Sequence, residues 1–137
     1  MTYLLDMNAC IALINGSSDV VRKRFDRAVA AGNQILVSSI GIFELWYGVF
    51  NSSRLQFNID RLDAFLEGSV TVLSFDEDDA KAAGSIRAML KRSGKPIGSY
   101  DMLLAGQAIQ RKLTLVTANI SEFSRVKGLV WQDWAKG

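Results

Sequence analysis

The sequence predicts a single α/β domain over residues 1–137, an α/β/α sandwich around a central, mostly parallel sheet. Short apolar runs alternate along the chain with longer segments that carry apolar residues at helical spacing. The composition is that of a globular protein, with 49% hydrophobic residues, 22% charged residues and one proline. Strands that are separated by helices pair in parallel through right-handed crossovers, which places helices on both faces of the sheet.

The expected elements alternate along the whole chain. The short apolar runs predict strands at residues 2–5, 35–37, 70–73, 113–116 and 129–131. Helices are expected at residues 9–14, 19–31, 40–50, 54–66, 76–91 and 99–111, with a short helical turn at 119–123. Because the first and fourth strands end at Asp6 and shortly before Asn119, these two side chains are expected at the same edge of a parallel sheet.

Capping and breaking residues mark the helix boundaries. Asp and Ser side chains accept hydrogen bonds from the free amides of a first helical turn, and such residues begin four helices: Asp19, Ser39, Asp76 and Ser99. Turn-forming residues follow four helices: Asn15-Gly16, Gly32-Asn33, Asn51-Ser52-Ser53 and Ser93-Gly94-Lys95-Pro96.

Charge and cysteine content limit the possible partners and compartments. The net charge of +2 gives no strong global field that would point to a nucleic acid. Cys10 is the only cysteine and lies in an apolar run, so we expect a buried thiol and a reducing compartment. No stretch is long and apolar enough to cross a membrane, and the N-terminus lacks the basic start of a signal peptide. We therefore expect a cytoplasmic protein with no membrane partner.

Four acidic or amide residues sit among apolar residues that are expected to be buried: Asp6, Glu44, Asp101 and Asn119. The chain has no histidine, which excludes Ser-His-Asp catalysis and His-ligated zinc. It also lacks a Walker-type phosphate loop and a G-x-G-x-x-G segment. Hard divalent cations take oxygen ligands, so the leading expectation is a Mg²⁺ or Mn²⁺ site that activates water.

Each of these residues also has a purely structural interpretation. Asp6 can cap the helix that follows it, and the two interpretations have equal weight. Asp101 lies near a helix start, where the helix dipole favours an acid, but the rest of that helix is apolar on nearly all sides. Asn119 and Thr117 can be ordinary turn residues. The neighbours of Glu44 in the sequence are too apolar for a glutamate that simply faces solvent, so the functional interpretation is favoured for this residue.

Two glycines lie one helical turn from Glu44. Gly41 and Gly48 are inside a predicted helix, where each glycine costs about 1 kcal/mol relative to alanine. We expect them to clear room on the face that carries the acid.

Four segments resemble the PIN domain and, within it, the VapC-type toxins of bacterial VapBC toxin–antitoxin systems. They occur in order and at family-like separations over essentially the whole chain, at residues 3–8, 38–48, 97–105 and 115–123. The resemblance implies a single PIN-like nuclease domain and a hydrolase that cleaves RNA with Mg²⁺ or Mn²⁺. It also implies the endoribonuclease toxin of a type II toxin–antitoxin module, a homodimer, and silencing by a VapB-type antitoxin.

The resemblance also implies a role for individual residues. Asp6, Glu44 and Asp101 would be the acidic metal-binding residues, and Asn119 would take the fourth catalytic position. The remaining residues of these segments that could support the site are Asn8, Thr117 and Glu122. Met7 departs from the family, which usually has Thr or Ser at this position, so it offers no hydroxyl to the carboxylates.

Two other functions stay open. One is a catalytically weak PIN-like module that binds RNA or a partner, and the other is a structure-specific DNA nuclease. The helices at 40–50 and 54–66 carry several large apolar side chains that a chain of this size does not easily bury: Trp46, Tyr47, Phe50, Leu55, Phe57 and Ile59. We expect part of this set to form a groove beside the acids for an amphipathic antitoxin segment.

Overall fold

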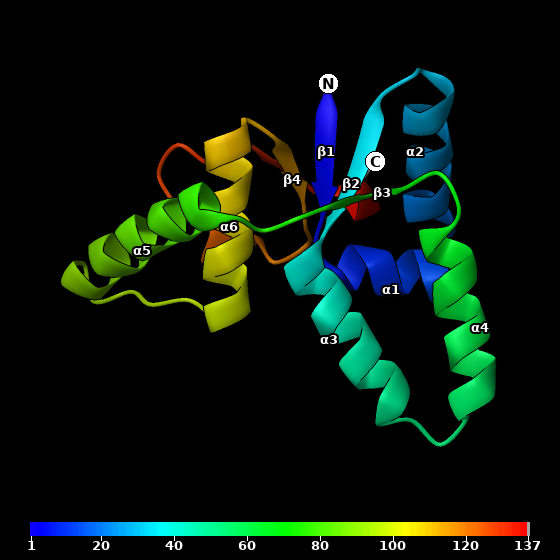
Figure 1. Ribbon diagram of the computed structural model, residues 1–137. Helices are drawn as coiled ribbons and strands as arrows, with labels where there is room; N and C mark the ends of the chain where they lie inside the picture. The colour runs from blue at the N-terminus through cyan, green and yellow to red at the C-terminus, as the bar shows by residue number, and fades with distance from the viewer. Residues whose placement is uncertain (137) are drawn as a thin grey trace.

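A computed structural model describes residues 1–136 (Figure 1). The strands are β1 (Thr2–Leu5), β2 (Gln34–Ser38), β3 (Thr71–Leu73), β4 (Thr114–Val116) and β5 (Trp131–Gln132). The helices are α1 (Met7–Asn15), α2 (Asp19–Ala30), α3 (Ser39–Phe50), α4 (Leu55–Leu66), α5 (Glu77–Arg92), α6 (Ser99–Arg111) and α7 (Ile120–Phe123). A 3₁₀-helix, η1 (Trp134–Lys136), follows the last strand and was not expected from the sequence.

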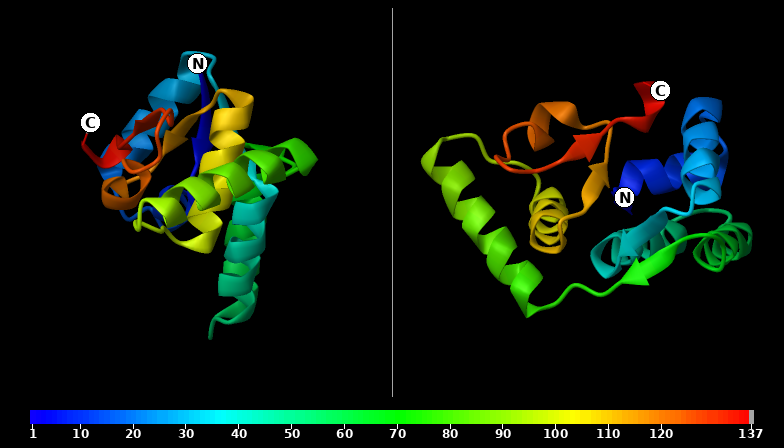
Figure 2. Two further views of the ribbon diagram at one scale, coloured as in Figure 1. Left: turned by 90° about the vertical axis from the view of Figure 1, so that its left-hand side faces the viewer. Right: turned by 90° about the horizontal axis from the view of Figure 1, so that it is seen from above.

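The strands form one sheet in the order β3-β2-β1-β4-β5. Every strand pair in residues 1–136 is parallel, so the sheet that was expected to be mostly parallel is wholly so. The chain adds β2 and β3 on one side of β1 and then returns to add β4 and β5 on the other (Figure 2). The Asp6 amide donates to the Val116 carbonyl at 3.0 Å, which joins β1 and β4 at the point where the strand order reverses.

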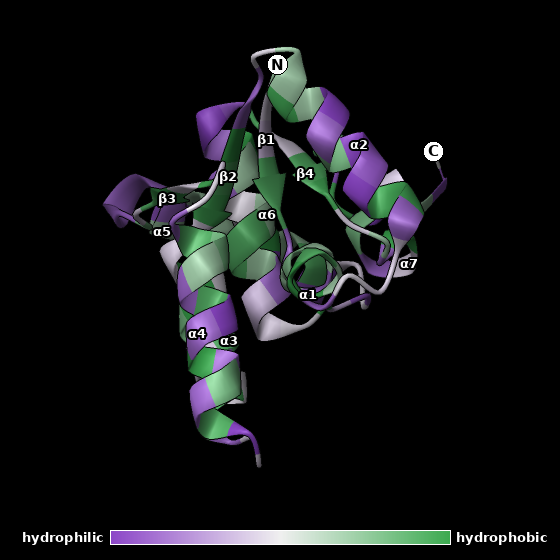
Figure 3. Cartoon of the chain, turned by 90° about the vertical axis from the view of Figure 1, so that its right-hand side faces the viewer, coloured by the Kyte–Doolittle hydropathy of each residue, from purple (hydrophilic) through white to green (hydrophobic). Residues whose placement is uncertain are grey.

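Helices cover both faces of the sheet, as the sequence predicts. Successive side chains of a strand point to opposite faces, so each central strand contributes to two cores. Tyr3 and Leu5 pack with α1, α2, α3 and α4, whereas Leu4 packs with α5 and α6. The hydrophobic colour of the strands in Figure 3 reflects this burial on both faces. Cys10 lies in the first core as expected, and burial raises the pKa of its thiol.

Helices α5 and α6 approach each other closely on one face of the sheet. A Cβ atom on Gly106 would lie 2.6 Å from the Ala83 Cα, so only glycine fits at this crossing. Nearby, Arg111 at the end of α6 donates to the fully buried Asp79 at 3.1 Å. Burial alone would raise the pKa of Asp79, but the hydrogen bonds and charge of Arg111 outweigh it, and the net pKa is lowered. This ion pair ties the start of α5 to the end of α6.

Several helix starts differ from the sequence-based expectation by one or two residues. Helix α1 begins at Met7 rather than at residue 9, and α4 begins at Leu55 rather than at residue 54. Ser38, not Ser39, caps α3 by accepting from the Ile40 amide, because the Ser39 hydroxyl instead accepts from the Phe75 amide at 3.0 Å. Ser18 caps α2 in place of Asp19. Gly98 precedes α6 without a side-chain cap, so Ser99 is its first helical residue. Asp76 caps α5 as expected, within a full capping box.

Helices α3 and α4 pack along each other and project away from the sheet as a hairpin (Figure 1). None of the helices in residues 1–136 has the length and hydropathy needed to cross a membrane.

Candidate active site

One pocket at the carboxyl edge of the sheet brings the four candidate residues together. It has a volume of about 250 Å³, and Asp6, Glu44, Asp101 and Asn119 all line it. Asp6 follows β1 and Asn119 follows β4, while Glu44 and Asp101 reach the pocket from α3 and α6. Residues separated by more than a hundred positions therefore meet because parallel strands end at one edge. We call this cavity the acidic pocket.

Asp6 combines both interpretations that the sequence left open. Its Oδ1 accepts a hydrogen bond of 2.8 Å from the Ala9 amide, so it is the N-cap of α1. Its side chain is also buried and lines the acidic pocket. Burial raises the pKa of Asp6, while hydrogen bonds from the Thr117 hydroxyl and the Ala9 amide act in the opposite direction. These hydrogen bonds hold the carboxylate in one orientation at the wall of the pocket.

Glu44 lies in the middle of α3, half-buried, and burial raises the pKa of its carboxyl. Its side chain has no hydrogen-bond partner among residues 1–136, so its oxygens are available to a ligand. The expectation that two glycines clear room for Glu44 is wrong. A Cβ on Gly41 would meet only Val37 Cγ1 at 3.9 Å, and a Cβ on Gly48 would meet nothing within 4 Å.

Asp101 is the most perturbed acid of the pocket. Burial is the largest cause, followed by the hydrogen bond and the charge of Glu122 and then by the charges of Asp6 and Glu44; together they raise the pKa of Asp101 to about 6. Carboxylates raise one another's pKa when they share a site without a counter-charge. A cation in the pocket would relieve the part of this shift that comes from repulsion between the acids.

Asn119, Thr117 and Glu122 surround Asp101 and Asp6 with hydrogen bonds. The Asn119 side chain donates to Glu122 and, at 3.3 Å, to Asp101. Its backbone amide donates to the Thr117 hydroxyl oxygen at 2.9 Å. Glu122 also accepts from the Gly98 amide at 3.2 Å, which fixes the start of α6 beside α7. The structure therefore places two of the three supporting residues in direct contact with the acids.

The last predicted supporting residue, Asn8, lies on the first turn of α1 together with Met7, the residue that departs from the family. Asn8 is exposed and lines the pocket without contacting an acid through a hydrogen bond. Met7 is partly buried and lines the pocket as well. The thioether of Met7 cannot donate a hydrogen bond. The side-chain hydrogen bond that Asp6 accepts comes instead from the Thr117 hydroxyl.

The donor set suits a hard divalent cation, because every candidate ligand offers oxygen. In residues 1–136, however, no three His, Cys, Asp or Glu side chains converge closely enough to form a ready-made metal site. The acids surround the pocket instead, and the Asn119 amide lies between Asp101 and Glu122. The oxygen ligands and the repulsion between the acids suit a metal ion. The described residues do not, however, form a compact ligand cluster in advance of metal binding.

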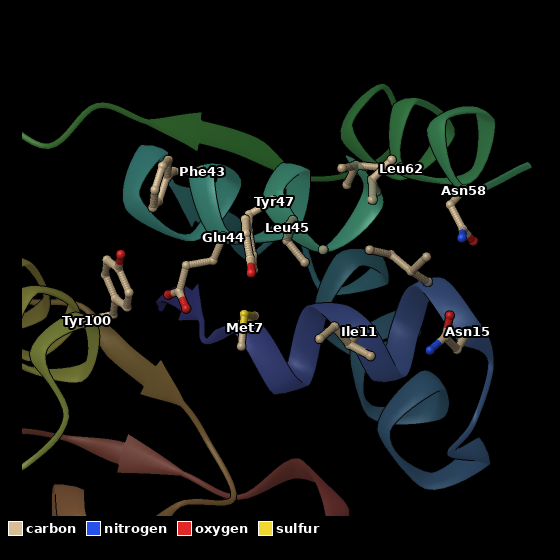
Figure 4. A pocket seen from close by; sticks show the side chains of 13 residues that line it. Met7, Ile11, Asn15, Phe43, Glu44, Leu45, Tyr47, Asn58, Leu62 and Tyr100 are labelled. Atoms are coloured by element: carbon tan, nitrogen blue, oxygen red, sulfur yellow. The ribbon is translucent and has the colours of Figure 1, made fainter. Parts of the chain in front are cut away.

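A larger apolar groove of about 630 Å³ continues from the acidic pocket between α1, α3 and α4 (Figure 4). Met7, Glu44 and Tyr100 line both cavities, so the two are adjacent. Tyr47 lines the groove with 66% of its surface exposed. Trp46 belongs to the core instead: it is partly buried, packs against the first core and stacks on Phe50. The expected exposure of large apolar side chains thus holds for Tyr47, Phe50, Leu55 and Phe57, whereas Trp46 and Ile59 are partly buried against the core.

Comparisons with known proteins agree with this arrangement. The family model described as "PIN domain" matches residues 3–129. The chain is 36% identical over 134 residues to a tRNA(fMet)-specific endonuclease VapC of Salmonella typhimurium, with 98% of each chain covered. It is 37% identical to Ribonuclease VapC2 of Rickettsia felis, covering 99% of this chain and all of that protein. A solved structure of VapBC2 from Rickettsia felis, bound to a DNA fragment from its promoter, contains a similar chain with a TM-score of 0.91 and 36% identity, covering 98% of this chain and 99% of that one.

Proposed function

The chain belongs to the PIN-domain family and, within it, to the VapC-type ribonucleases, and from this membership we propose that it is a Mg²⁺- or Mn²⁺-dependent endoribonuclease toxin. Its action would be in the cytoplasm, where its RNA substrate is. The tRNA that the Salmonella relative's name specifies is one candidate substrate.

The clustering of Asp6, Glu44 and Asp101 around one pocket is the observation that carries the proposal. Three acids brought together from three separate elements, one of them with a pKa raised to about 6, are an unfavourable arrangement without a cation. A bound Mg²⁺ or Mn²⁺ would lower the pKa of water and neutralise charge on the attacked phosphate.

The chain's own residues would orient this chemistry. Asp6 and Asp101 would hold the ion, with Glu44 completing the acidic set from α3. Thr117 fixes the Asp6 carboxylate, and Asn119 holds Asp101 beside Glu122. Without a cation, the negative pocket would repel the RNA backbone, so we expect cleavage to depend absolutely on the metal.

A cleavage assay tests this proposal and its alternatives. Purified wild-type protein is incubated with single-stranded RNA, with tRNA(fMet) and with single-stranded DNA, each with Mg²⁺, Mn²⁺ or EDTA. We expect metal-dependent cleavage of RNA that Asp101→Asn abolishes. Asp63→Asn removes an exposed acid of α4 far from the pocket in sequence and serves as the matched control. Cleavage of DNA alone would support a DNA nuclease, and RNA binding without cleavage would support a non-catalytic module.

We further propose that a VapB-type antitoxin occupies the apolar groove and that the toxin forms a homodimer. Exposed Tyr47 and the groove's continuity with the acidic pocket support such a partner, because one bound segment could cover both cavities. Tyr47→Glu should weaken antitoxin binding in a titration, whereas Phe50→Glu on the same helix should not. Phe50 is equally exposed, at 65%, but does not line the groove. Light scattering of the purified chain tests the dimer.

A further inference from the structure

Two exposed aromatic side chains stand at the junction of the acidic pocket and the apolar groove. Phe43 of α3 is 58% exposed and Tyr100 of α6 is 43% exposed. Their ring centroids are 6.0 Å apart, and the ring planes are tilted by 48°. Large aromatic side chains are normally buried, so a neighbouring pair left in solvent points to a ligand.

Each aromatic residue directly precedes a candidate metal-binding acid in the sequence. Phe43 comes before Glu44, and Tyr100 comes before Asp101. Consecutive helical residues are separated by about 100° around the helix axis, so each ring lies beside its acid rather than behind it. Figure 4 shows the Glu44 carboxylate next to Tyr100, with Phe43 close by on the same helix, α3. A ligand bound at Glu44 would therefore lie beside Tyr100.

The chain that leads into the acidic pocket before α6 is basic, and we call residues 91–96, which are the last two residues of α5 and the loop after them, the basic loop. Gly98 and Ser99 line the pocket, and the segment just before them carries Lys91, Arg92 and Lys95, all exposed. Within residues 1–136 none of these three cations forms an ion pair. Arg125 donates to the Pro96 carbonyl at 3.0 Å and adds a fourth positive charge to this loop.

We propose that Phe43 and Tyr100 form a stacking platform for a nucleobase next to the cleaved phosphodiester of single-stranded RNA, with the basic loop holding the backbone on the other side. The inference rests on the proposed ribonuclease function and adds the residues that would position its substrate. Proteins that bind single strands combine aromatic rings, on which bases stack, with a positively charged track for the backbone.

The charge distribution favours RNA over a peptide at this position. The part of the groove along Ile11, Leu45 and Tyr47 is apolar and suits a peptide segment. Phe43 and Tyr100 lie at the end of the groove where Glu44 lies (Figure 4). Glu44 and Tyr100 also line the acidic pocket, and the basic loop leads along the chain into Gly98 and Ser99 of that pocket. Rings next to metal-binding acids and cations fit a ligand that carries both bases and phosphates.

The test is a binding titration with the full chain carrying Asp101→Asn, so that RNA stays intact. The probes are a fluorescein-labelled single-stranded RNA of about 12 nucleotides, within the usual site size, and the same oligonucleotide with abasic riboses. Phe43→Leu/Tyr100→Leu keeps apolar volume but removes both rings. Phe43→Tyr/Tyr100→Phe keeps the rings, and Phe50→Leu is the matched control on α3.

We expect the leucine pair to weaken RNA binding roughly 5- to 150-fold, the range that stacking of one base gives, and to leave abasic RNA binding unchanged. The ring-conserving pair and Phe50→Leu should bind RNA like the parent. Unchanged RNA affinity, or an equal loss for abasic RNA, overturns the inference. If the leucine pair unfolds, Tyr100→Leu against Tyr100→Phe decides by the same comparison.

Two further outcomes separate this inference from the proposed function. If the Phe43→Leu/Tyr100→Leu variant no longer binds antitoxin but still binds RNA, the aromatic pair is a protein-docking surface and the inference is wrong. If the wild-type chain neither binds nor cleaves RNA, the proposed function fails and the platform fails with it. If the wild type cleaves and binds RNA, and the leucine variants bind RNA as tightly as their parent, only the platform is contradicted.

Discussion

Asn119 donates a hydrogen bond to Asp101, with its Nδ2 lying 3.3 Å from Oδ2 of the carboxylate. The same amide donates to Glu122, while its Oδ1 accepts from the Ser121 hydroxyl at 3.4 Å. The N–H₂ group of Asn119 therefore holds two acids side by side, which a carboxylate at this position could not do. The Asn119 amide, which we propose for the fourth catalytic position, therefore also has a structural role in the metal-free protein.

Asn119→Asp should destabilise the metal-free protein and tighten metal binding. The substitution removes two donated hydrogen bonds and adds a negative charge, so we expect a loss of about 1–2 kcal/mol in the free energy of unfolding. Added Mg²⁺ should raise the melting temperature of this variant more than that of wild type. Thermal melts with EDTA and with Mg²⁺ measure both effects. Asn119→Ala, which loses the donors without adding charge, is the control, and an Asp variant that melts like wild type in EDTA would contradict the assigned hydrogen bonds.

The raised pKa of Asp101 predicts how stability depends on pH. Its pKa is about 6 in the folded protein and roughly 3.9 in an unfolded chain. Between these values the folded state binds more protons than the unfolded state, so the contribution of Asp101 to stability falls as pH rises through this window. When the pH is lowered from 7 to 5, the melting temperature of metal-free wild type should therefore rise relative to that of Asp101→Asn. Equal pH slopes for the two proteins in EDTA would show that Asp101 is not perturbed.

Glu44→Gln should leave the metal-free protein at least as stable as wild type. Glu44 is half-buried with a raised pKa and has no hydrogen-bond partner in residues 1–136 that the substitution would remove. An uncharged amide of the same shape relieves repulsion with the other acids. We expect Mn²⁺ to stabilise wild type more than the variant, as measured by calorimetry across a metal titration. A clear drop in the melting temperature without metal would mean that Glu44 has a structural role instead.

Thr117→Val should lower RNA cleavage, and adding Met7→Thr should restore part of it. Valine matches the shape of the fully buried threonine but leaves Asp6 and the Asn119 amide without their hydroxyl partner. The expected loss of stability is about 1–3 kcal/mol, because a buried donor then lacks its acceptor. A threonine at position 7 would offer Asp6 a new hydroxyl from the first turn of α1. Cleavage rates of wild type, both single variants and the double variant test this, and Met7→Thr alone should raise the rate.

Two helical glycines should respond in opposite ways to alanine. At Gly48 the added Cβ meets nothing within 4 Å, so Gly48→Ala should raise the free energy of unfolding by about 0.5–1 kcal/mol through helix propensity. At Gly106 the Cβ would lie 2.6 Å from the backbone of Ala83, so Gly106→Ala should destabilise the protein by at least about 1–3 kcal/mol. Urea denaturation of both variants measures the difference, and a stabilised Gly106→Ala would show that α5 and α6 do not pack at this distance.

Local sequence signals predicted most of the architecture. Apolar runs and helical spacing identified the strands and the main helices, and the alternation of the two predicted the parallel sheet that Leu5, Val37 and Val116 share. Strand ends alone placed Asp6 and Asn119 at one edge. The errors were local as well: Ser38 and Ser39 are both capable caps, and only the contact of Ser39 with the Phe75 amide decides between them.

The tertiary structure decided how the site residues are arranged. The sequence named the acids, but only the fold gives the distance of 3.3 Å between Asn119 and Asp101, and only the fold exposes Phe43 and Tyr100 while burying part of Trp46. These facts depend on contacts between elements that are far apart in the chain. Hydrophobic periodicity reports which side of an element is buried, not which side chain of another element it meets. The sequence therefore predicts which residue types form the pocket, whereas their hydrogen bonds and their exposure arise from packing.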